Sequence, residues 1–202
     1  MTVLKSTLAT VAGGATLVVY AVGVAVSLAF FPGRFRITQS YLSDLGNATL
    51  NPRGALAYDV GIAVAGVCLF PFFFGLRVWR TDVTWRNRVL GATRAIGAFE
   101  GATLILVGAH PTGAAHVTWS NAQFFSNLLV LGLGTTALFG HPRFVKAIGY
   151  FAIVAIVLQA AALVLIVLGR SSPLVEWLTV ITTLVFVALV ALISKDNSAA
   201  AR

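Results

Sequence analysis

Long apolar segments alternate with short polar intervals along the whole chain. Six such segments lie at about residues 7–31, 52–76, 89–109, 118–140, 147–169 and 173–193. Each is long enough to cross a bilayer as an α-helix, which takes about 20 residues. An apolar run that stands alone in lipid can pair its backbone groups only within itself, as a helix does. The pattern therefore predicts an all-α, polytopic membrane protein, a six-transmembrane-helix bundle in which residues 1–202 form one domain.

Composition points to the same surroundings. Of the 202 residues, 58% are hydrophobic and 10% are charged, whereas a soluble domain carries about 25% charged residues. Such a chain cannot cover its surface with polar groups, so membrane lipid is the expected partner of most of that surface. The first segment is longer than the core of a signal peptide and is expected to span the bilayer. The single cysteine, Cys68, excludes a disulfide within the chain.

The basic residues predict the orientation of the bundle. They do not gather beside aromatic stacking positions, so no nucleic-acid partner is expected. The side that contains both termini receives ten of the 14: Lys5, Arg77, Arg80, Arg86, Arg88, Arg94, Arg143, Lys146, Lys195 and Arg202. The other side receives four: Arg34, Arg36, Arg53 and Arg170. Because cytoplasmic loops carry the excess of Lys and Arg, both termini are expected in the cytoplasm, and the first loop, residues 32–51, faces outward from the cell membrane.

That first loop contains the longest polar interval, "ITQSYLSDLGNATLNPRG". Its "SYLSDLG" portion is expected to form a short helical turn that ends at Gly46, which would place Ser40 and Asp44 on one face. In this interpretation the turn is an amphipathic lid that presents a serine and a carboxylate to the bundle. The alternative is that Asp44 only closes a polar turn, since Ser, Asp, Gly and Asn are common turn formers.

Two histidines bracket the loop "HPTGAAHV" on the same side of the membrane. With Asp44, His110 and His116 form the candidate catalytic set, because a histidine beside a carboxylate can serve as a general base near neutral pH. No cofactor motif is evident. Zinc is the one metal that these three residues suggest, although an interval with Pro111 and Gly113 is a weak ligand signal. The alternative is that both histidines only anchor the loop through hydrogen bonds.

Further polar residues lie within or beside the apolar segments. The candidate binding residues are Ser40, Asn51, Asp59, Glu100, Asn127 and Gln159. Asp59 is expected about 10 Å below the outer end of its helix and Glu100 about 15 Å down the third helix. A carboxylate at mid-bilayer costs roughly 2.5–3.5 kcal/mol on insertion scales and usually faces the bundle interior. The partners expected for Glu100 at similar depth are Asn127, Gln159 and Thr182 or Thr183.

Small residues recur on the third segment. Gly97 and Gly101 form a GxxxG pair, which predicts a close approach of a neighbouring helix. Packing within the bundle is the favoured interpretation, and a dimer face is the alternative.

The order of these motifs resembles a known family. An outward "SDLG" follows the first segment, "NP" opens the second, and a histidine–proline turn follows a Gly-rich third. This order is similar to the small prokaryotic membrane proteins of the domain-of-unknown-function family numbered nine hundred and ninety-eight. The resemblance spans nearly the whole chain. It implies a six-helix bundle in a prokaryotic plasma membrane, with Asp44 and His110 or His116 at an outer site, and no established activity. The layout alone is also similar to the Frag1/DRAM/Sfk1 membrane proteins, some of which are linked to lipid-anchor remodelling.

Three functions remain open from the sequence. The first is an outward-facing polar His/Asp pocket that binds or acts on a lipid or lipid-linked group. The second is a non-catalytic subunit or scaffold of a larger membrane complex, with other membrane subunits or further copies of the chain as partners. The third is a proton-linked transporter or sensor in which Glu100 titrates.

Overall fold

The computed structural model describes residues 2–196, with side chains from Thr7 to Lys195. All regular elements in this range are helical. They are α1 (Thr2–Ala29), η1 (Leu42–Gly46), α2 (Ala55–Gly75), η2 (Leu76–Trp79), α3 (Thr84–Ala109), α4 (Gly113–Leu138), α5 (Lys146–Val167) and α6 (Pro173–Asp196), where η marks a 3-10 helix. The side chains of Lys5 and Arg202, which entered the charge count, lie outside the described residues.

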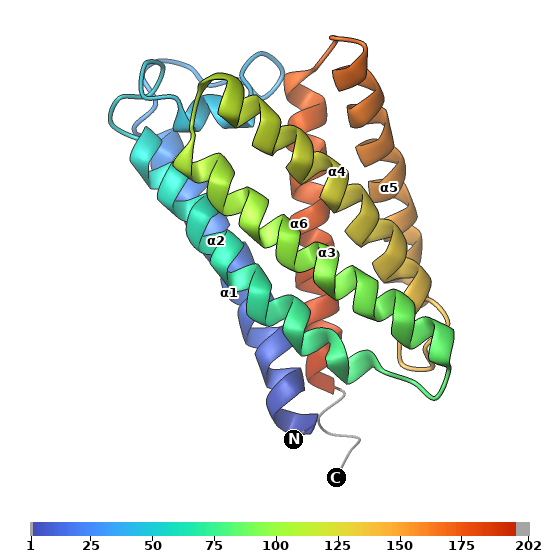
Figure 1. Ribbon diagram of the computed structural model, residues 1–202. Coiled ribbons are helices and arrows are strands. Elements are labelled where there is room, and N and C mark those ends of the chain that lie inside the picture. Colours follow the sequence, from blue (N-terminus) through green and yellow to red (C-terminus); the bar gives the residue numbers. More distant parts are fainter. Residues whose placement is uncertain (1, 197–202) are drawn as a thin grey trace.

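The six α-helices form a closed ring. Each packs against the next along the chain, and α6 returns to pack against α1. Figure 1 shows the start of α1 and the end of α6 at the same end of the bundle, which we name the terminal end. The first loop with η1, the α3–α4 connection and the α5–α6 connection lie at the opposite end, which we name the η1 end. The helices therefore run alternately up and down, and the start of α1 and the end of α6 lie on one side.

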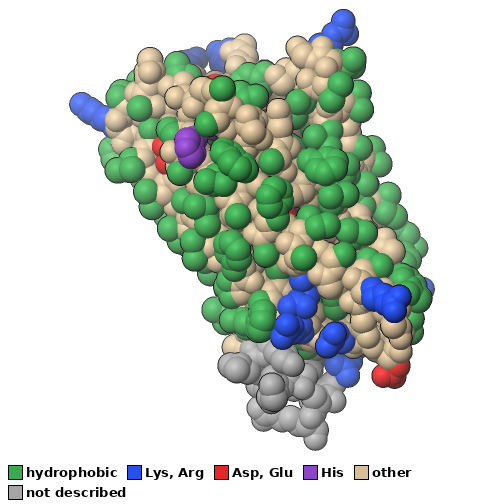
Figure 2. Space-filling view, in the orientation of Figure 1, with side chains coloured by type: hydrophobic (Ala, Val, Ile, Leu, Met, Phe, Trp, Pro, Cys, Tyr) green, Lys and Arg blue, Asp and Glu red, His purple; other side chains and the backbone are tan. Residues whose placement is uncertain are grey.

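Five of the described helices are long and apolar enough to cross a membrane. They are α1 from Thr7, α2 together with η2, α3, α5, and α6 up to Lys195. Large hydrophobic side chains stay exposed around the ring, such as Val18, Val60, Phe99, Phe125 and Val157. Figure 2 shows hydrophobic side chains over the middle of the visible face, with Lys and Arg toward its two ends. An exposed apolar surface of this extent needs a lipid environment, so the chain is an integral membrane protein.

Several helices begin at other residues than the apolar pattern predicts. α3 begins at Thr84 and α4 at Gly113, because a helix can continue through polar residues where it leaves the apolar layer. α2 begins three residues after the expected proline start at Pro52, and α6 begins at Pro173 as expected. α5 begins at Lys146, so His141 lies in the loop before it.

His141 packs its ring against Trp79 at 5.0 Å between centroids. Burial, and then the positive charges of Arg143 and Arg86, hold the pKa of His141 below its usual value.

The glycine pair on α3 serves packing inside the bundle. A Cβ added at Gly97 would collide with the Phe73 ring on α2. A Cβ at Gly101 would lie 2.8 Å from the carbonyl oxygen of Gly66, also on α2. The GxxxG pair therefore allows α2 and α3 to touch, as predicted, and at these positions it faces the protein.

Gly97→Ala is expected to destabilise the bundle by about 1–3 kcal/mol, the usual cost of overpacking. Gly91→Ala on the same helix is the matched control, because a Cβ there meets nothing within 4 Å. Thermal unfolding of the two variants in detergent micelles measures the difference. Equal melting temperatures for Gly97→Ala and the wild type would contradict the close α2–α3 packing.

Candidate functional site

The first loop is docked on the start of α6. Glu176 accepts the backbone N–H groups of Leu42 at 3.2 Å and Ser43 at 3.3 Å. The indole N–H of Trp177 donates to the carbonyl oxygen of Ser40 at 3.3 Å. Leu42 and Leu45 are both fully buried, because residues three apart share a face in a 3-10 helix. The loop thus forms a short helical lid over the η1 end, although its inward residues are leucines and Ser43.

Asp44 has a structural place in this lid. Its Oδ2 accepts the backbone N–H of Tyr41 at 2.8 Å, which closes the turn at its start. The Asp44 side chain does not line the central cavity described below. The expected i,i+4 pair of Ser40 and Asp44 does not form, because η1 is a 3-10 helix that begins only at Leu42.

Asn51 joins three elements beneath the lid. The buried side-chain amide donates to Ser27 Oγ on α1 at 2.8 Å and to the carbonyl oxygen of Leu45 at 3.1 Å. Its Oδ1 accepts the backbone N–H of Gly54 at 3.1 Å, just before α2. All these partners are protein groups, so Asn51 stabilises the fold of the first loop.

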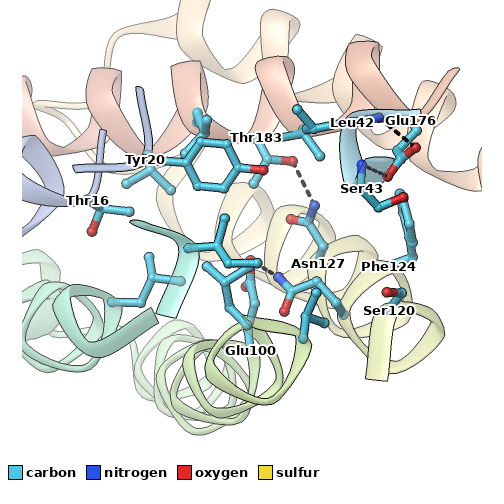
Figure 3. A pocket seen from close by; sticks show the side chains of 18 of the residues that line it. Thr16, Tyr20, Leu42, Ser43, Glu100, Ser120, Phe124, Asn127, Glu176 and Thr183 are labelled. Atoms are coloured by element: carbon cyan, nitrogen blue, oxygen red, sulfur yellow. Dashed lines mark hydrogen bonds between the residues drawn. The ribbon is translucent and has the colours of Figure 1, made fainter. Parts of the chain in front are cut away.

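A central cavity of about 90 Å³ lies inside the ring, below η1. It is bounded by α1, η1, α2, α3, α4 and α6 (Figure 3). Its polar lining residues are Thr16, Tyr20, Ser43, Tyr58, Glu100, His116, Ser120, Gln123, Asn127, Glu176 and Thr183. None of the lining residues described is a lysine or an arginine. The cavity therefore has a polar lining in which Glu100 and Glu176 are the acidic residues, and the Asp44 and His110 of the predicted His/Asp pocket do not belong to it.

Glu100 lies in the wall of this cavity and is only 2% exposed. Its Oε1 accepts a hydrogen bond from Gln123 Nε2 at 3.4 Å. Its Oε2 is buried and has no hydrogen-bond partner among the described residues. Gln123 is in turn held by the hydroxyl of Thr103. Glu100 therefore presents one acceptor oxygen that the surrounding protein leaves unsatisfied.

A second network adjoins Glu100. Asn127 donates to Thr183 Oγ1 at 2.7 Å and to Gln159 Oε1 at 3.3 Å, and Figure 3 shows its amide directed toward Thr183. The fully buried Gln159 donates to the carbonyl oxygen of Phe124 at 3.0 Å. Asn127 Oδ1 is buried without a partner among the described residues. The residues expected to pair with Glu100 thus pair mainly with one another, and Gln123 takes that place.

Sequence reasoning missed Ser120 and Gln123, although α4 contains a signal for both. His116, Ser120, Gln123 and Asn127 follow one another at spacings of four, three and four residues. This spacing places them on one face of a helix. The same polar residues explain why α4 is not among the five helices that qualify as spans by apolarity.

The two histidines have different surroundings. His116 lies inside α4 instead of before it, and its Nδ1 is 3.0 Å from the carbonyl oxygen of His110. A carbonyl only accepts, so in the neutral ring Nδ1 carries the proton and Nε2 is the acceptor. That Nε2 is 3.4 Å from Ser120 Oγ. His110 bonds to the carbonyl oxygen of Leu106 at 3.0 Å and does not line the cavity.

The described residues contain no group of three or more His, Cys, Asp and Glu side chains that could hold a metal. Asp44, His110 and His116 bond instead to backbone groups close to them in the chain. The zinc hypothesis therefore has no ligand set in this part of the chain. Four of the six predicted binding residues, Ser40, Asn51, Asp59 and Gln159, lie outside the cavity lining. Ser40 contributes its carbonyl oxygen to Trp177, and Asp59 has a buried Oδ1 without a described partner, beside Gly46.

A second space of about 150 Å³ opens beside the cavity, between α4, α5 and α6. Much of its wall is apolar, with Val117, Ala162, Leu165, Ile166 and Val175. It shares five lining residues with the cavity: Ser43, His116, Ser120, Phe124 and Glu176. The two spaces therefore meet at one residue of η1 and at residues of α4 and α6.

Fold and site together define a helical integral membrane protein with a polar central cavity. Residues 6–193 match the family described as proteins of unknown function, DUF998, and the chain belongs to this family. The resemblance inferred from the motifs is thereby confirmed, whereas the similarity to the Frag1/DRAM/Sfk1 proteins has no support. A search of curated proteins and a search of solved structures each found no match.

Asn51→Ala is expected to lower the melting temperature in detergent, because it removes the bonds that join α1, η1 and α2 and leaves the buried Leu45 carbonyl with fewer donors. A loss of about 1–3 kcal/mol is typical when a buried partner is removed. Thr49→Ala is the control, since Thr49 is exposed in the same loop. A thermal shift assay that gives both variants the same melting temperature would refute this stabilising role of Asn51.

Proposed function

We propose that the central cavity binds the polar head of a single-chain lipid or lipid-linked group, and that this head carries a hydrogen-bond donor such as a hydroxyl or an amine. The observation that supports this is the pair of unpartnered acceptors, Glu100 Oε2 and Asn127 Oδ1, on residues that line one cavity. A buried polar atom without a partner costs about 1–3 kcal/mol. A donor on the ligand would remove that cost.

The charges of the lining favour the same class of head group. Glu100 and Glu176 are its acidic residues, and no lysine or arginine lies beside them. A phosphate would meet two acidic side chains and no lysine or arginine there. A neutral or positively charged head is therefore favoured over an anionic one.

The shape supports a ligand with one chain. A water molecule needs about 10–15 Å³ of such volume, so a cavity of about 90 Å³ admits a small head group. The adjoining space has an apolar wall from α5 and α6, which suits an alkyl chain. A lipid would then enter between α4 and α5, with its head toward Glu100.

Catalysis on the bound group is a second candidate, and His116 is the residue that favours it. Its Nε2 accepts, and Ser120 Oγ is the hydroxyl within reach. A histidine that takes the proton of a serine is the usual way to activate that nucleophile. Asp44 and His110 would then act only by shaping the lid and the turn before α4.

We further propose that the η1 end faces outward and that both termini are cytoplasmic, in the plasma membrane of a prokaryote. All six helices would cross the bilayer, with the polar stripe of α4 turned to the cavity. The excess of Lys and Arg toward the terminal end supports this orientation.

The binding proposal predicts selectivity among three probes of equal chain length: dodecylamine, dodecanol and dodecyl phosphate. Protein reconstituted in nanodiscs is expected to bind the amine most tightly and the phosphate most weakly. Glu100→Gln should weaken amine binding about 10-fold or more, because a hydrogen bond to a charged group contributes about 1.5–3 kcal/mol. Calorimetric titration measures these affinities.

Asp82→Asn is the matched control, since it removes an acid from the exposed α2–α3 connection. An equal loss of amine binding in that variant, or tighter binding of the phosphate, would refute the proposal.

Other functions predict other outcomes. If the site is catalytic, Ser120→Ala should still bind a dodecyl ester but should no longer hydrolyse it. Unchanged amine binding in Glu100→Gln together with loss of a pH-dependent flux would favour transport. A stable co-purified partner that replaces ligand binding would favour the subunit function.

The orientation predicts opposite labelling of two engineered cysteines. With Cys68→Ser as background, Thr112→Cys should react with a membrane-impermeant maleimide in intact cells, because Thr112 is exposed at the η1 end. Asp82→Cys should react only after the cells are opened. The reverse pattern would place the cavity entrance in the cytoplasmic leaflet.

A further inference from the structure

A second surface feature lies at the other end of the bundle, between α2 and α3. It is an open groove of about 560 Å³, and Arg94 is its charged lining residue. The rest of the described lining is mostly apolar, including Phe70, Phe74 and Ala98. No acidic residue belongs to it. The groove therefore joins an apolar channel to an arginine without a carboxylate beside it.

Arg94 is held in place by the neighbouring helix. Its Nε donates to the carbonyl oxygen of Phe73 at 3.0 Å. Its guanidinium carbon lies 5.7 Å from the centre of the Phe74 ring. The bond to Phe73 uses only Nε of Arg94, so the two terminal nitrogens of the guanidinium take no part in it. These two nitrogens can donate together to a phosphate.

One further arginine lies at the same aromatic ring, and another acts electrostatically on Arg94. The Arg77 guanidinium lies 4.4 Å from the centre of the Phe74 ring, so Arg77 and Arg94 share one aromatic side chain. Arg77 and Arg80 are the charged groups that act electrostatically on Arg94, and both are cations. Three positive charges beside an apolar groove call for an anion with an apolar part.

We propose that this groove binds an anionic phospholipid, with its phosphate on Arg94 and Arg77 and an acyl chain along Phe70 and Ala98, while Arg80 adds positive charge nearby. Basic sites between membrane helices have the chemistry to hold such head groups. Inorganic phosphate offers the same head chemistry, but it would leave the apolar groove unused. The site is independent of the central cavity, which has carboxylates and takes a head group of the opposite kind.

The test is retention of dioleoyl phosphatidylglycerol against dioleoyl phosphatidylcholine, measured on the detergent-solubilised full chain by native mass spectrometry. The wild type should retain the anionic lipid preferentially. Arg94→Gln should reduce that retention about fivefold, the effect of one basic residue near an anionic head group. Arg88→Gln is the matched control, because it removes the same charge from an exposed position on α3 outside the groove.

If Arg94→Gln and Arg88→Gln lose the same amount of phosphatidylglycerol retention, the effect comes from net charge alone and the proposal is overturned. Equal retention of the two lipids by the wild type would overturn it as well. Complete displacement of phosphatidylglycerol by millimolar inorganic phosphate would show that the acyl chain contributes nothing, which also contradicts it. If Arg94→Gln fails to fold, Arg77→Gln gives the same comparison, because its guanidinium faces the same ring and does not bond to Phe73.

Discussion

Lipid offers no hydrogen bonds, so every polar group inside this bundle must find its partner within the protein. That constraint explains the hydrogen bonds of Asn51, whose side-chain amide bonds to α1, to η1 and to the residue just before α2. It also explains the exchange among Asn127, Gln159 and Thr183. Five buried side-chain atoms of the described residues are exceptions to this rule, and two of them, Glu100 Oε2 and Asn127 Oδ1, belong to residues that line the central cavity. The need of buried polar groups for hydrogen-bond partners therefore underlies both the side-chain networks between the helices and the kind of head group proposed for the cavity.

The two proposed sites differ in the kind of ionisable residue that they contain. The central cavity below η1 contains Glu100 and Glu176 and no described lysine or arginine. The groove at the terminal end contains Arg94, with Arg77 beside it and no described acid. One site thus suits a donor-bearing or cationic head, and the other an anionic one. Both open toward apolar surface, which is why amphiphiles are the common ligand class in the two proposals.

Much of the fold was predictable because it depends on local pattern. The apolar runs located all six α-helices. The glycine pair predicted that another helix packs closely against α3, and Gly66 and Phe73 of α2 make that contact. Boundaries were less predictable, because helices such as α4 continue through polar turns. Of the residues that line the cavity, Glu100, Asn127 and His116 were named from the sequence, whereas Ser120 and Gln123 were not. Because η1 is a 3-10 helix, its buried face carries Leu42 and Leu45. Asp44 instead closes the turn at the start of η1.

The sequence by itself determined that this chain is a helical membrane protein of the DUF998 family, since apolar length and motif order are properties of the chain alone. Only the tertiary structure decided which polar residues meet. Glu100 bonds to Gln123 across the α3–α4 contact, and Glu176 holds the N–H groups of a loop more than a hundred residues away. Such pairings depend on how helices rotate against one another, and that rotation is set by packing around the closed ring.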